Sequence, residues 1–383
     1  MQELIYFDNS ATTKIYSEAL EEMNRIYKNF YGNPSSFHKI GSDAEKVLQN
    51  ARETIAKTLG VSDREIFFTS GGTESNNWAI KGSARANKKR APYIVTSKTE
   101  HASVIECFSY LETEGLFPEF LEVSSDGLLD PILICEKIHD QTSLISFIIV
   151  NNETGAIQNI EQLIHSIRLK NPKTIIHVDA VQAYGKIPLN LSMLDVDLAS
   201  ISAHKIHGPK GCGALYIKNK TRINPVLHGG GQERKFRSGT ENVPAIHGFA
   251  TAAEIVHDRM DDNIKNNKLL KSIIIDGLIK NFGRDGFFIN SPDNAYEGIL
   301  NISFPRVKAQ VLMQHLEALN IFVSIGSACS SHKNVQSHVL KAMNLPKENI
   351  DGAIRLSFSG DNTADEAKRF IEATKEIISV IKY

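Results

Sequence analysis

The sequence has few cysteines and no cysteine-rich motif. Its 383 residues include 4 cysteines, which lie far apart along the chain. This spacing excludes a disulfide framework and a CxxC metal site, so the sequence predicts no bound metal. An isolated cysteine is most often a small buried hydrophobic residue, and we expect this of Cys107, Cys135 and Cys212.

Long apolar runs and an excess of one charge are also missing. The longest apolar stretches, such as residues 144–150, have the length of a strand and fall short of the roughly 20 residues that span a bilayer. The first residues, MQELIYFDNSATT, lack the segments of a secretory signal, which predicts a cytoplasmic protein with no membrane partner. Because 43 Lys and Arg residues balance 44 Asp and Glu residues, no direct contact with nucleic acid is expected.

The hydrophobic pattern predicts an α/β fold. Short β-rich runs alternate with helical patterns, and the predicted strands are residues 66–69, 93–97, 144–150, 174–178 and 198–202. Such alternation is typical of a mainly parallel central sheet covered by helices. From about residue 250, longer amphipathic stretches indicate a second, smaller domain that ends in a helix at residues 364–381.

The clearest helix is predicted between Ser42 and Gly60. Ser42 and Glu45 have the spacing of a capping box, and an apolar stripe follows them. Gly60 supplies a stop signal for this helix.

Polar segments follow the predicted strands. They read SGGTES, KTEHAS, NNETG, DAVQ and AHKIHGPKG in chain order. In a parallel sheet ligands bind beyond the carboxyl ends of the strands. We therefore expect these segments to form one site.

Three of these segments carry residues suited to a phosphorylated cofactor. Residues 70–75 can present backbone N–H groups and the Thr73 hydroxyl to a phosphate, although a tight strand-to-helix turn explains the same glycines. Asp179 ends a predicted strand, where a carboxylate can keep a pyridine nitrogen protonated; the alternative is a helix N-cap. Lys205 lies between two histidines and close to glycines, which favours an amine that forms a Schiff base over a solvated surface lysine.

Two further candidate site residues lie in the last part of the chain. Cys329 lies in the small, polar stretch SIGSACSSH, which predicts an exposed loop and a reactive thiol, although a thiol without function is the alternative. His332 and Lys333 favour its thiolate. Arg355 lies within an apolar, strand-like run, where a buried guanidinium needs an anion such as a substrate carboxylate.

Taken together, the motifs resemble those of the cysteine desulfurases of the NifS and IscS type, within the class V aminotransferase group of fold-type I enzymes that use pyridoxal 5'-phosphate (PLP). The resemblance runs from FDNSATT at residues 7–13 to Gly360. Its most specific parts are HVDAVQ at residues 177–182, residues 202–213, and GGGQERKFRSGTEN at residues 229–242. It implies a large PLP-binding domain at residues 16–250 and a smaller α+β domain formed by residues 1–15 and 251–383.

The resemblance also implies roles for single residues. Lys205 would bind PLP covalently, Asp179 would pair with the pyridine nitrogen, Gln182 would contact the ring hydroxyl and His101 would stack on the ring. The whole implied cofactor set is Gly72, Thr73, His101, Asn152, Asp179, Gln182, Ser202, His204, Lys205 and Thr240. Thr240 would reach across from a second subunit of a homodimer, and the substrate would be bound by Asn33, Asn152 and Arg355.

The implied reaction converts L-cysteine to L-alanine. Lys205, with His101, would move protons, and the Cys329 thiolate would take the sulfur as a persulfide and pass it to an acceptor, such as an iron-sulfur scaffold protein or a tRNA thiolation enzyme. The segment SSHKNVQSH after Cys329 lacks the Leu-Glu-Pro of many relatives, which affects the choice of acceptor and not the reaction. The alternatives are a selenocysteine lyase, another PLP aminotransferase of this group, or a non-catalytic scaffold.

Overall fold

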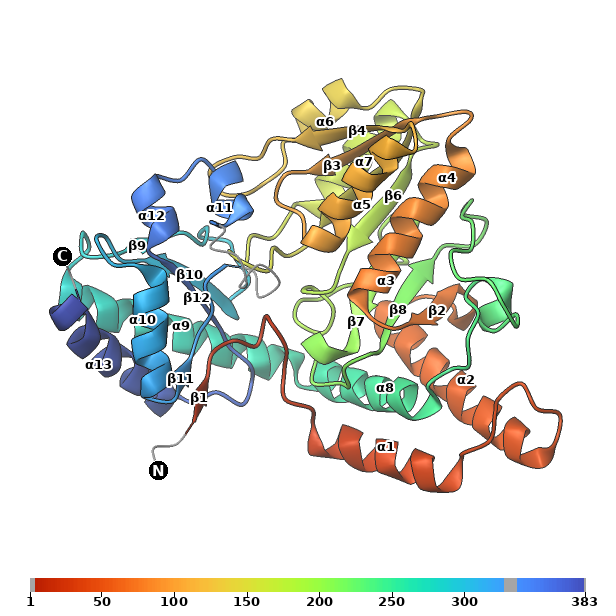
Figure 1. Cartoon of the computed structure of the whole chain (residues 1–383), viewed down its shortest axis with the longest axis horizontal. Helices are drawn as coiled ribbons and strands as arrows, with labels where there is room; N and C mark the ends of the chain where they lie inside the picture. The colour runs from red at the N-terminus through yellow and green to blue at the C-terminus, as the bar shows by residue number, and fades with distance from the viewer. Residues whose placement is uncertain (1–3, 327–335, 382–383) are drawn as a thin grey trace.

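A computed structural model describes residues 4–326 and 336–381. It has a large lobe and a small lobe, side by side in Figure 1. None of the described helices is long and apolar enough to cross a membrane.

The large lobe is built on a seven-stranded sheet with the strand order β2-β8-β7-β6-β5-β3-β4. Only β8 runs opposite to its neighbours; the other adjacent strands are parallel. The mainly parallel sheet expected from the sequence is therefore confirmed, with one reversed strand inserted. The strands are β2 (Ile66–Thr69), β3 (Tyr93–Ser97), β4 (Phe117–Leu121), β5 (Thr142–Ile148), β6 (Ile175–Asp179), β7 (Leu198–Ser202) and β8 (Gly213–Ile217).

Helices cover both faces of this sheet, because successive strand residues point to opposite faces and both faces are apolar. Phe68 and Ile145 belong to one buried cluster, whereas their neighbours Phe67 and Leu144 belong to the other. The first face packs against α2 (Lys39–Leu59), α6 (Pro131–Lys137), α7 (Ile160–Lys170) and α8 (Val243–Asp258). The second packs against η2 (Trp78–Gly82), α4 (Ser83–Asn87) and α5 (Ala102–Thr113).

The helix predicted from Ser42 begins one turn earlier, at Lys39, so the predicted capping box is wrong. His38 is the N-cap, and its Nδ1 accepts a hydrogen bond from the backbone N–H of Gly41 at 3.3 Å. Gly60 ends the helix as predicted, with a left-handed φ of 70° that suits glycine.

The small lobe has its own sheets and its own core. Antiparallel strands β12-β10-β9 form one sheet, and β1 pairs in parallel with β11. The elements are β1 (Ile5–Tyr6), α9 (Met260–Phe282), β9 (Phe288–Ile289), β10 (Ile299–Ser303), α10 (Ala309–Ala318), β11 (Ile321–Phe322), α11 (His338–Ala342), α12 (Lys347–Asp351), β12 (Ala353–Ser357) and α13 (Ala364–Ile381). The remaining elements of the chain are α1 (Ser17–Asn29), η1 (Asp63–Glu65), α3 (Gly72–Asn77), η3 (Ala203–Lys205) and η4 (Glu233–Lys235).

The hydrophobic core of the small lobe joins the two ends of the chain. Ile5 and Phe7 pack with residues from α9, α10 and α13, while α8 packs into the core of the large lobe. Figure 1 shows α8 under the large sheet and α9 beside the small one. Residue 250 lies within α8, whose Val256 still packs into the large core, and the domain division at residues 15 and 250 stays a prediction.

Candidate active site

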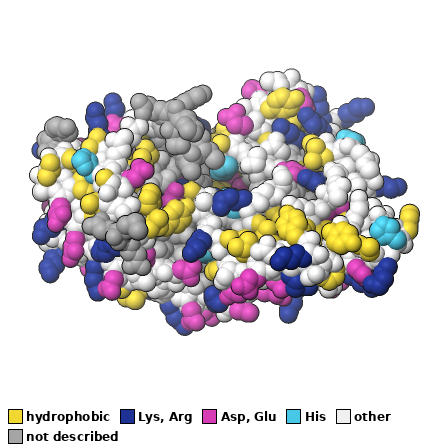
Figure 2. All heavy atoms as spheres, turned by 60° about the horizontal axis from the view of Figure 1, so that its bottom comes forward, with side chains coloured by type: hydrophobic (Ala, Val, Ile, Leu, Met, Phe, Trp, Pro, Cys, Tyr) yellow, Lys and Arg dark blue, Asp and Glu magenta, His cyan; other side chains and the backbone are white. Residues whose placement is uncertain are grey.

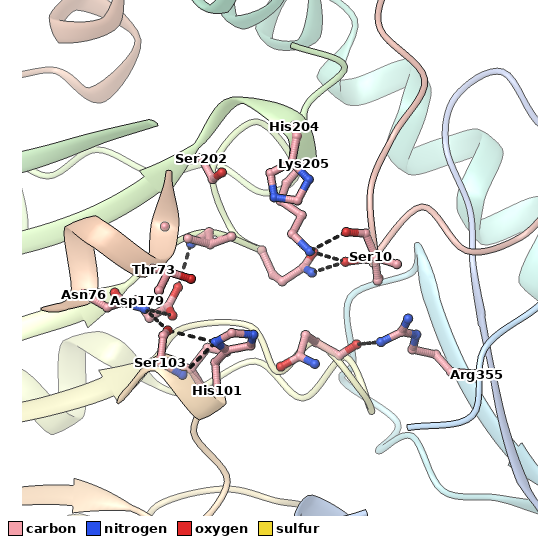
Figure 3. A pocket seen from close by; sticks show the side chains of 16 residues that line it. Ser10, Thr73, Asn76, His101, Ser103, Asp179, Ser202, His204, Lys205 and Arg355 are labelled. Atoms are coloured by element: carbon pink, nitrogen blue, oxygen red, sulfur yellow. Dashed lines mark hydrogen bonds between the residues drawn. The ribbon is translucent and has the colours of Figure 1, made fainter. Parts of the chain in front are cut away.

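The segments that follow the parallel strands meet at one edge of the large sheet and enclose a cavity of about 170 Å³ (Figure 3). This is the arrangement expected at the carboxyl ends of parallel strands. Most of the predicted site residues line it, namely Gly72, Thr73, His101, Asn152, Asp179, Gln182, Ser202, His204, Lys205 and Arg355. Ser10, Ala11, Asn76, Ser103, Ile148 and Val181, to which the sequence analysis gave no role, complete the lining.

Lys205 reaches the cavity from η3, the short helix that follows β7. Its Nζ donates hydrogen bonds to the backbone oxygens of Ser10 at 2.5 Å and of Ala11 at 2.9 Å. Ser10 and Ala11 follow β1, so the N-terminal segment of the small lobe lines the cavity beside this lysine (Figure 3).

Asp179 is the last residue of β6 and is almost completely buried. One carboxylate oxygen accepts a hydrogen bond from Asn76 Nδ2 at 2.7 Å, and the other accepts one from the backbone N–H of Val181 at 3.0 Å. A turn follows Asp179, not a helix. The alternative role as a helix N-cap is therefore excluded, and the carboxylate faces the cavity.

His101 caps the first turn of α5. Its Nδ1 accepts a hydrogen bond from the backbone N–H of Ser103 at 3.1 Å and lies 2.8 Å from the Ser103 hydroxyl. Burial lowers the pKa of His101; Asp179 opposes this shift, and Lys205 adds to it. The imidazole is therefore mainly neutral at physiological pH, with its ring held through Nδ1 at the cavity wall.

Thr73, Ser202 and His204 lie at the end of the cavity beside the start of α3 (Figure 3). The Ser202 hydroxyl is buried, and no partner for it is found in the described part of the chain. An added Cβ at Gly72 would lie 2.8 Å from a methyl group of Val181, so a larger residue would displace this side chain of the cavity wall. Burial, followed by the charge of Lys205, lowers the pKa of His204 to about 4.

Arg355 is a residue of the small lobe that lines the cavity. It lies on β12, as the apolar run predicted, and is only 1% exposed. Its Nη1 donates a hydrogen bond to the backbone oxygen of Asn152 at 2.9 Å, and its Nη2 forms an ion pair with Asp8 at 2.6 Å. The guanidinium is thus held in place at the boundary between the lobes.

Two predicted site residues, Asn33 and Thr240, are absent from the lining of this cavity. Asn33 is exposed, and its side chain accepts a hydrogen bond from the backbone N–H of Ser35 at 2.9 Å. Thr240 is exposed at the end of the loop at residues 229–242. Cys329 lies outside the described residues. Of the other cysteines, Cys107 and Cys212 are buried as expected, whereas Cys135 is only partly buried.

Two ion pairs hold the loop at residues 229–242. Arg52 of α2 donates two hydrogen bonds of 2.8 Å to the buried carboxylate of Glu233. Arg237 pairs with Glu74 at 2.8 Å, and Glu74 also accepts a hydrogen bond from the backbone N–H of Ser70 at 2.7 Å. The loop that presents Thr240 is therefore attached to the turn that precedes α3.

Glu100 is a buried carboxyl group that the sequence analysis did not find. It precedes His101, and its Oε1 accepts a hydrogen bond from the Ser97 hydroxyl at 2.5 Å, while Oε2 has no partner among the described residues. Burial raises the pKa of Glu100 from 4.5 to about 8. The side chain is therefore mainly protonated at neutral pH.

This raised pKa predicts a pH dependence of stability. The folded state holds a proton that the unfolded state releases above about pH 4.5, so the stabilisation is complete below that value and is lost as the pH rises through about 8. Between about pH 5 and pH 8, the unfolding free energy of the protein should fall relative to that of Glu100→Gln by about 1 kcal/mol per pH unit. Urea denaturation across this range measures the difference. Parallel pH profiles for the two proteins would refute the assignment, and the exposed Glu106→Gln serves as the control.

Comparison with known proteins identifies the class of this chain. A model of the class-V aminotransferase family matches residues 5–370. The fold and the side chains of the cavity agree with this match, and the chain belongs to the class-V aminotransferase family, whose enzymes use pyridoxal 5'-phosphate.

Relatives that match over the full length of the chain assign it to a narrower group within this family. Cysteine desulfurase IscS of Methanosarcina thermophila is 40% identical over 379 residues, which cover 99% of this chain and 93% of that protein. Cysteine desulfurase IscS of Dictyoglomus turgidum is 40% identical over 383 residues, which cover 100% and 96%. A solved NifS-like protein has a TM-score of 0.93 at 40% identity and covers 98% of this chain and 100% of its own. Within its family, the chain is one of the cysteine desulfurases of the IscS and NifS type.

The described residues fit the cofactor of this family. The cavity offers an amine at Lys205, a buried carboxylate at Asp179 and hydroxyl groups at Thr73 and Ser202. Two buried polar atoms that line it, Ser202 Oγ and Asn76 Oδ1, have no hydrogen-bond partner in the parts of the chain that the structure describes. Buried polar groups are rarely left unpaired, so these atoms are suited to a polar ligand.

Proposed function

We propose that in this cavity the cysteine desulfurase removes the sulfur of L-cysteine, with Lys205 holding PLP and Cys329 accepting the sulfur. The observation that carries the proposal is the meeting of Lys205, Asp179 and His101 with Arg355 around one cavity. Each of these groups serves a separate need of the reaction: cofactor attachment, charge on the ring, proton transfer and substrate binding.

The cofactor would be held by residues at both ends of the cavity. Asp179 would accept a hydrogen bond from the pyridine nitrogen, and Thr73, Ser202 and His204 would hold the phosphate together with Gly72. Gln182 would donate to the ring hydroxyl, Asn152 would contact the ring region, and His101 would stack on the ring. When bound, PLP acts as an electron sink for bonds broken at the substrate.

Proton transfer would be carried out by Lys205 and His101. The Lys205 amine must be neutral to attach the cofactor, and once displaced by the substrate it lies where it can move a proton. His101 is mainly neutral because burial lowers its pKa, and its Nδ1 is held by Ser103. Its Nε2 is therefore the atom that would donate or accept a proton.

Arg355 would bind the carboxylate of cysteine, together with Asn152 and, from a second subunit, Asn33. A guanidinium grips a carboxylate with two parallel hydrogen bonds, which an ammonium cannot reproduce. SspA, whose solved structure is in complex with cysteine, is 32% identical to this chain with a TM-score of 0.83, and it covers 94% of this chain and 100% of its own. This likeness supports cysteine as the substrate.

Arg355→Lys is expected to raise KM for cysteine about 10- to 100-fold, because one charge-assisted hydrogen bond is lost. The effect on kcat should be smaller, since the contact exists in the ground state and in the transition state. Steady-state kinetics of alanine formation measure both constants. The exposed Arg284→Lys is the matched control, and an unchanged KM in Arg355→Lys would remove Arg355 from the substrate site.

Cys329 would take the sulfur by direct attack. Its thiolate would form a bond to the substrate sulfur as the carbon–sulfur bond breaks, and the electron pair would pass to the substrate carbon, which takes up a proton and becomes the methyl group of alanine. Ser324 is paired with Arg355 through backbone hydrogen bonds of 3.1 and 2.7 Å. Cys329 follows Ser324 by five residues, a length of chain that spans at most about 17 Å, and this short separation supports Cys329 as the acceptor.

We propose a homodimer in which Thr240 and Asn33 complete the partner's site. Large hydrophobic side chains are exposed between α1 and the start of α2, including Tyr31 at 73% and Phe37 at 107%. Figure 2 shows hydrophobic side chains gathered on the face that lies at the bottom of Figure 1. An apolar surface of this kind is typical of a protein–protein interface.

Sedimentation equilibrium should give the mass of two chains, and the double variant Tyr31→Glu, Phe37→Glu should give one chain that retains PLP poorly. Charged side chains in the interface would oppose association because they lose hydration. Met193→Glu, at a hydrophobic residue 83% exposed elsewhere, is the control. A monomeric wild type that is fully active would refute the shared site.

The persulfide of Cys329 would pass to a sulfur-acceptor protein, such as an iron-sulfur scaffold or a tRNA thiolation enzyme, in the cytoplasm. Alanine and sulfide assays after addition of L-cysteine and a thiol reductant test the reaction as a whole. Equal amounts of the two products are expected. Alanine without sulfide, or neither product from a protein with bound PLP, would favour another reaction of the family.

A further inference from the structure

Lys186 is a charged residue near the cavity that the reaction described above does not use. It lies in the segment after β6, four residues beyond Gln182, and its Nζ donates a hydrogen bond to Gln182 Oε1. Gln182 is buried, and its Nε2 donates to the backbone oxygen of Ser10 at 2.9 Å. The same oxygen accepts the hydrogen bond from Lys205.

These contacts fix the orientation of the Gln182 amide. An amide side chain can turn over and exchange its oxygen and nitrogen, unless its partners distinguish the two ends. Here the Lys186 amine donates to the oxygen, and the Ser10 carbonyl accepts from the nitrogen. The N–H₂ end is therefore the one on the side of Ser10 and Lys205, where a donor is needed if Gln182 contacts an oxygen of the cofactor.

Lys186 and Lys205 also share a second cavity. It has a volume of about 30 Å³, which is room for one or two water molecules, and it lies between the lobes. Its other polar residues include His207, Asn267 and Tyr296, and none of the residues found to line it is a carboxylate. Asn267 Oδ1 is buried and has no partner in the described part of the chain.

The charges around Lys186 are mainly of its own sign. Burial is the largest cause of a pKa far below the ordinary value for Lys186, although part of the residue's surface is exposed, and the charges of Lys205 and Arg355 lower it further. The charge of Lys186 also acts on His204 and His207, and burial lowers the pKa of both. Like charges at close range disfavour one another, so the neighbouring cations favour the neutral amine of Lys186, which still donates to Gln182 through an N–H group.

We propose that Lys186 is a positioning residue that orients the Gln182 amide toward the cofactor. The proposal rests on the proposed function, because it assumes that Lys205 holds PLP. Lys186 itself touches neither substrate nor cofactor in this account. It acts through the Gln182 amide.

Lys186→Met removes the donor to Gln182 while keeping the length of the side chain, and Lys186→Arg restores a donor. The visible absorbance of the bound cofactor, followed against pH in the holoenzyme, is the direct readout. We expect the pH midpoint to rise by about one unit in Lys186→Met and to return to the wild-type value in Lys186→Arg. The midpoint would rise because a Gln182 amide that turns over no longer donates to the oxygen of the cofactor, and a hydrogen bond to the charged form of a group favours that form.

If Lys186 had only a structural role, Lys186→Met would lower the thermal stability and leave the pH midpoint of the cofactor absorbance unchanged. Lys210→Met is the matched control, since Lys210 is exposed and lies in the same segment as Lys205. An unchanged midpoint in Lys186→Met, or an equal shift in Lys186→Arg, would overturn the proposal. If Lys205→Ala retained the visible absorbance of the wild type, the proposed function itself would fail, so the two failures can be told apart.

Discussion

Lys205→Ala is expected to abolish the covalent attachment of PLP and to lower the rate of alanine formation by at least about 10³-fold. The lysine is the only amine among the described residues that line the main cavity, and its Nζ is held at a fixed place by Ser10 and Ala11. Alanine leaves these carbonyl groups but removes the amine. The visible absorbance of the protein, before and after gel filtration, measures the attachment.

The control for this variant is Lys210→Ala, which removes an exposed lysine from the same segment. It should keep the absorbance and the activity of the wild type. Reduction with borohydride followed by peptide mapping identifies the lysine that carries the cofactor. Attachment at another lysine, or full activity of Lys205→Ala, would contradict the assignment.

Cys329→Ala should separate cofactor binding from sulfur transfer. The variant is expected to retain the visible absorbance of bound PLP, because the residues assigned to the cofactor are unchanged. It should form alanine from cysteine more slowly by on the order of 10³-fold, because the nucleophile that removes the sulfur is missing. Stopped-flow absorbance after addition of cysteine would still record substrate binding.

Cys135 supplies the matched control for this experiment. It is the partly buried cysteine of α6, and its thiol lies 3.8 Å from the backbone oxygen of Ser166. It is absent from the residues that line the main cavity. Cys135→Ala should behave as the wild type, and normal turnover by Cys329→Ala would place the sulfur acceptor elsewhere.

Much of the site could be predicted from the sequence because its residues follow directly on strands. The ends of parallel strands meet at one edge of a sheet, so the positions of Thr73, His101, Asp179 and Lys205 in their segments were sufficient to bring them together. Arg355 was predicted for a related reason. A charged residue within an apolar strand is buried by its neighbours, and burial requires a partner.

Contacts between distant parts of the chain could not be predicted in this way. Ser10 meets Lys205 across 195 positions in the sequence, and no local pattern marks a backbone oxygen as a ligand. Glu100 reads as a polar loop residue, yet the fold buries it completely. The start of α2 was placed too late, because His38 is a rarer N-cap than Ser42 and local propensity favours serine.

Sulfur transfer to Cys329 in a single turnover tests the account most directly. The holoenzyme is mixed with less than one equivalent of L-cysteine labelled at sulfur, without a reductant, and alanine and the labelled peptide are measured together. The account predicts one alanine for each sulfur atom bound and the label on the peptide that contains Cys329. Alanine formed with the label free in solution or on another cysteine would contradict it.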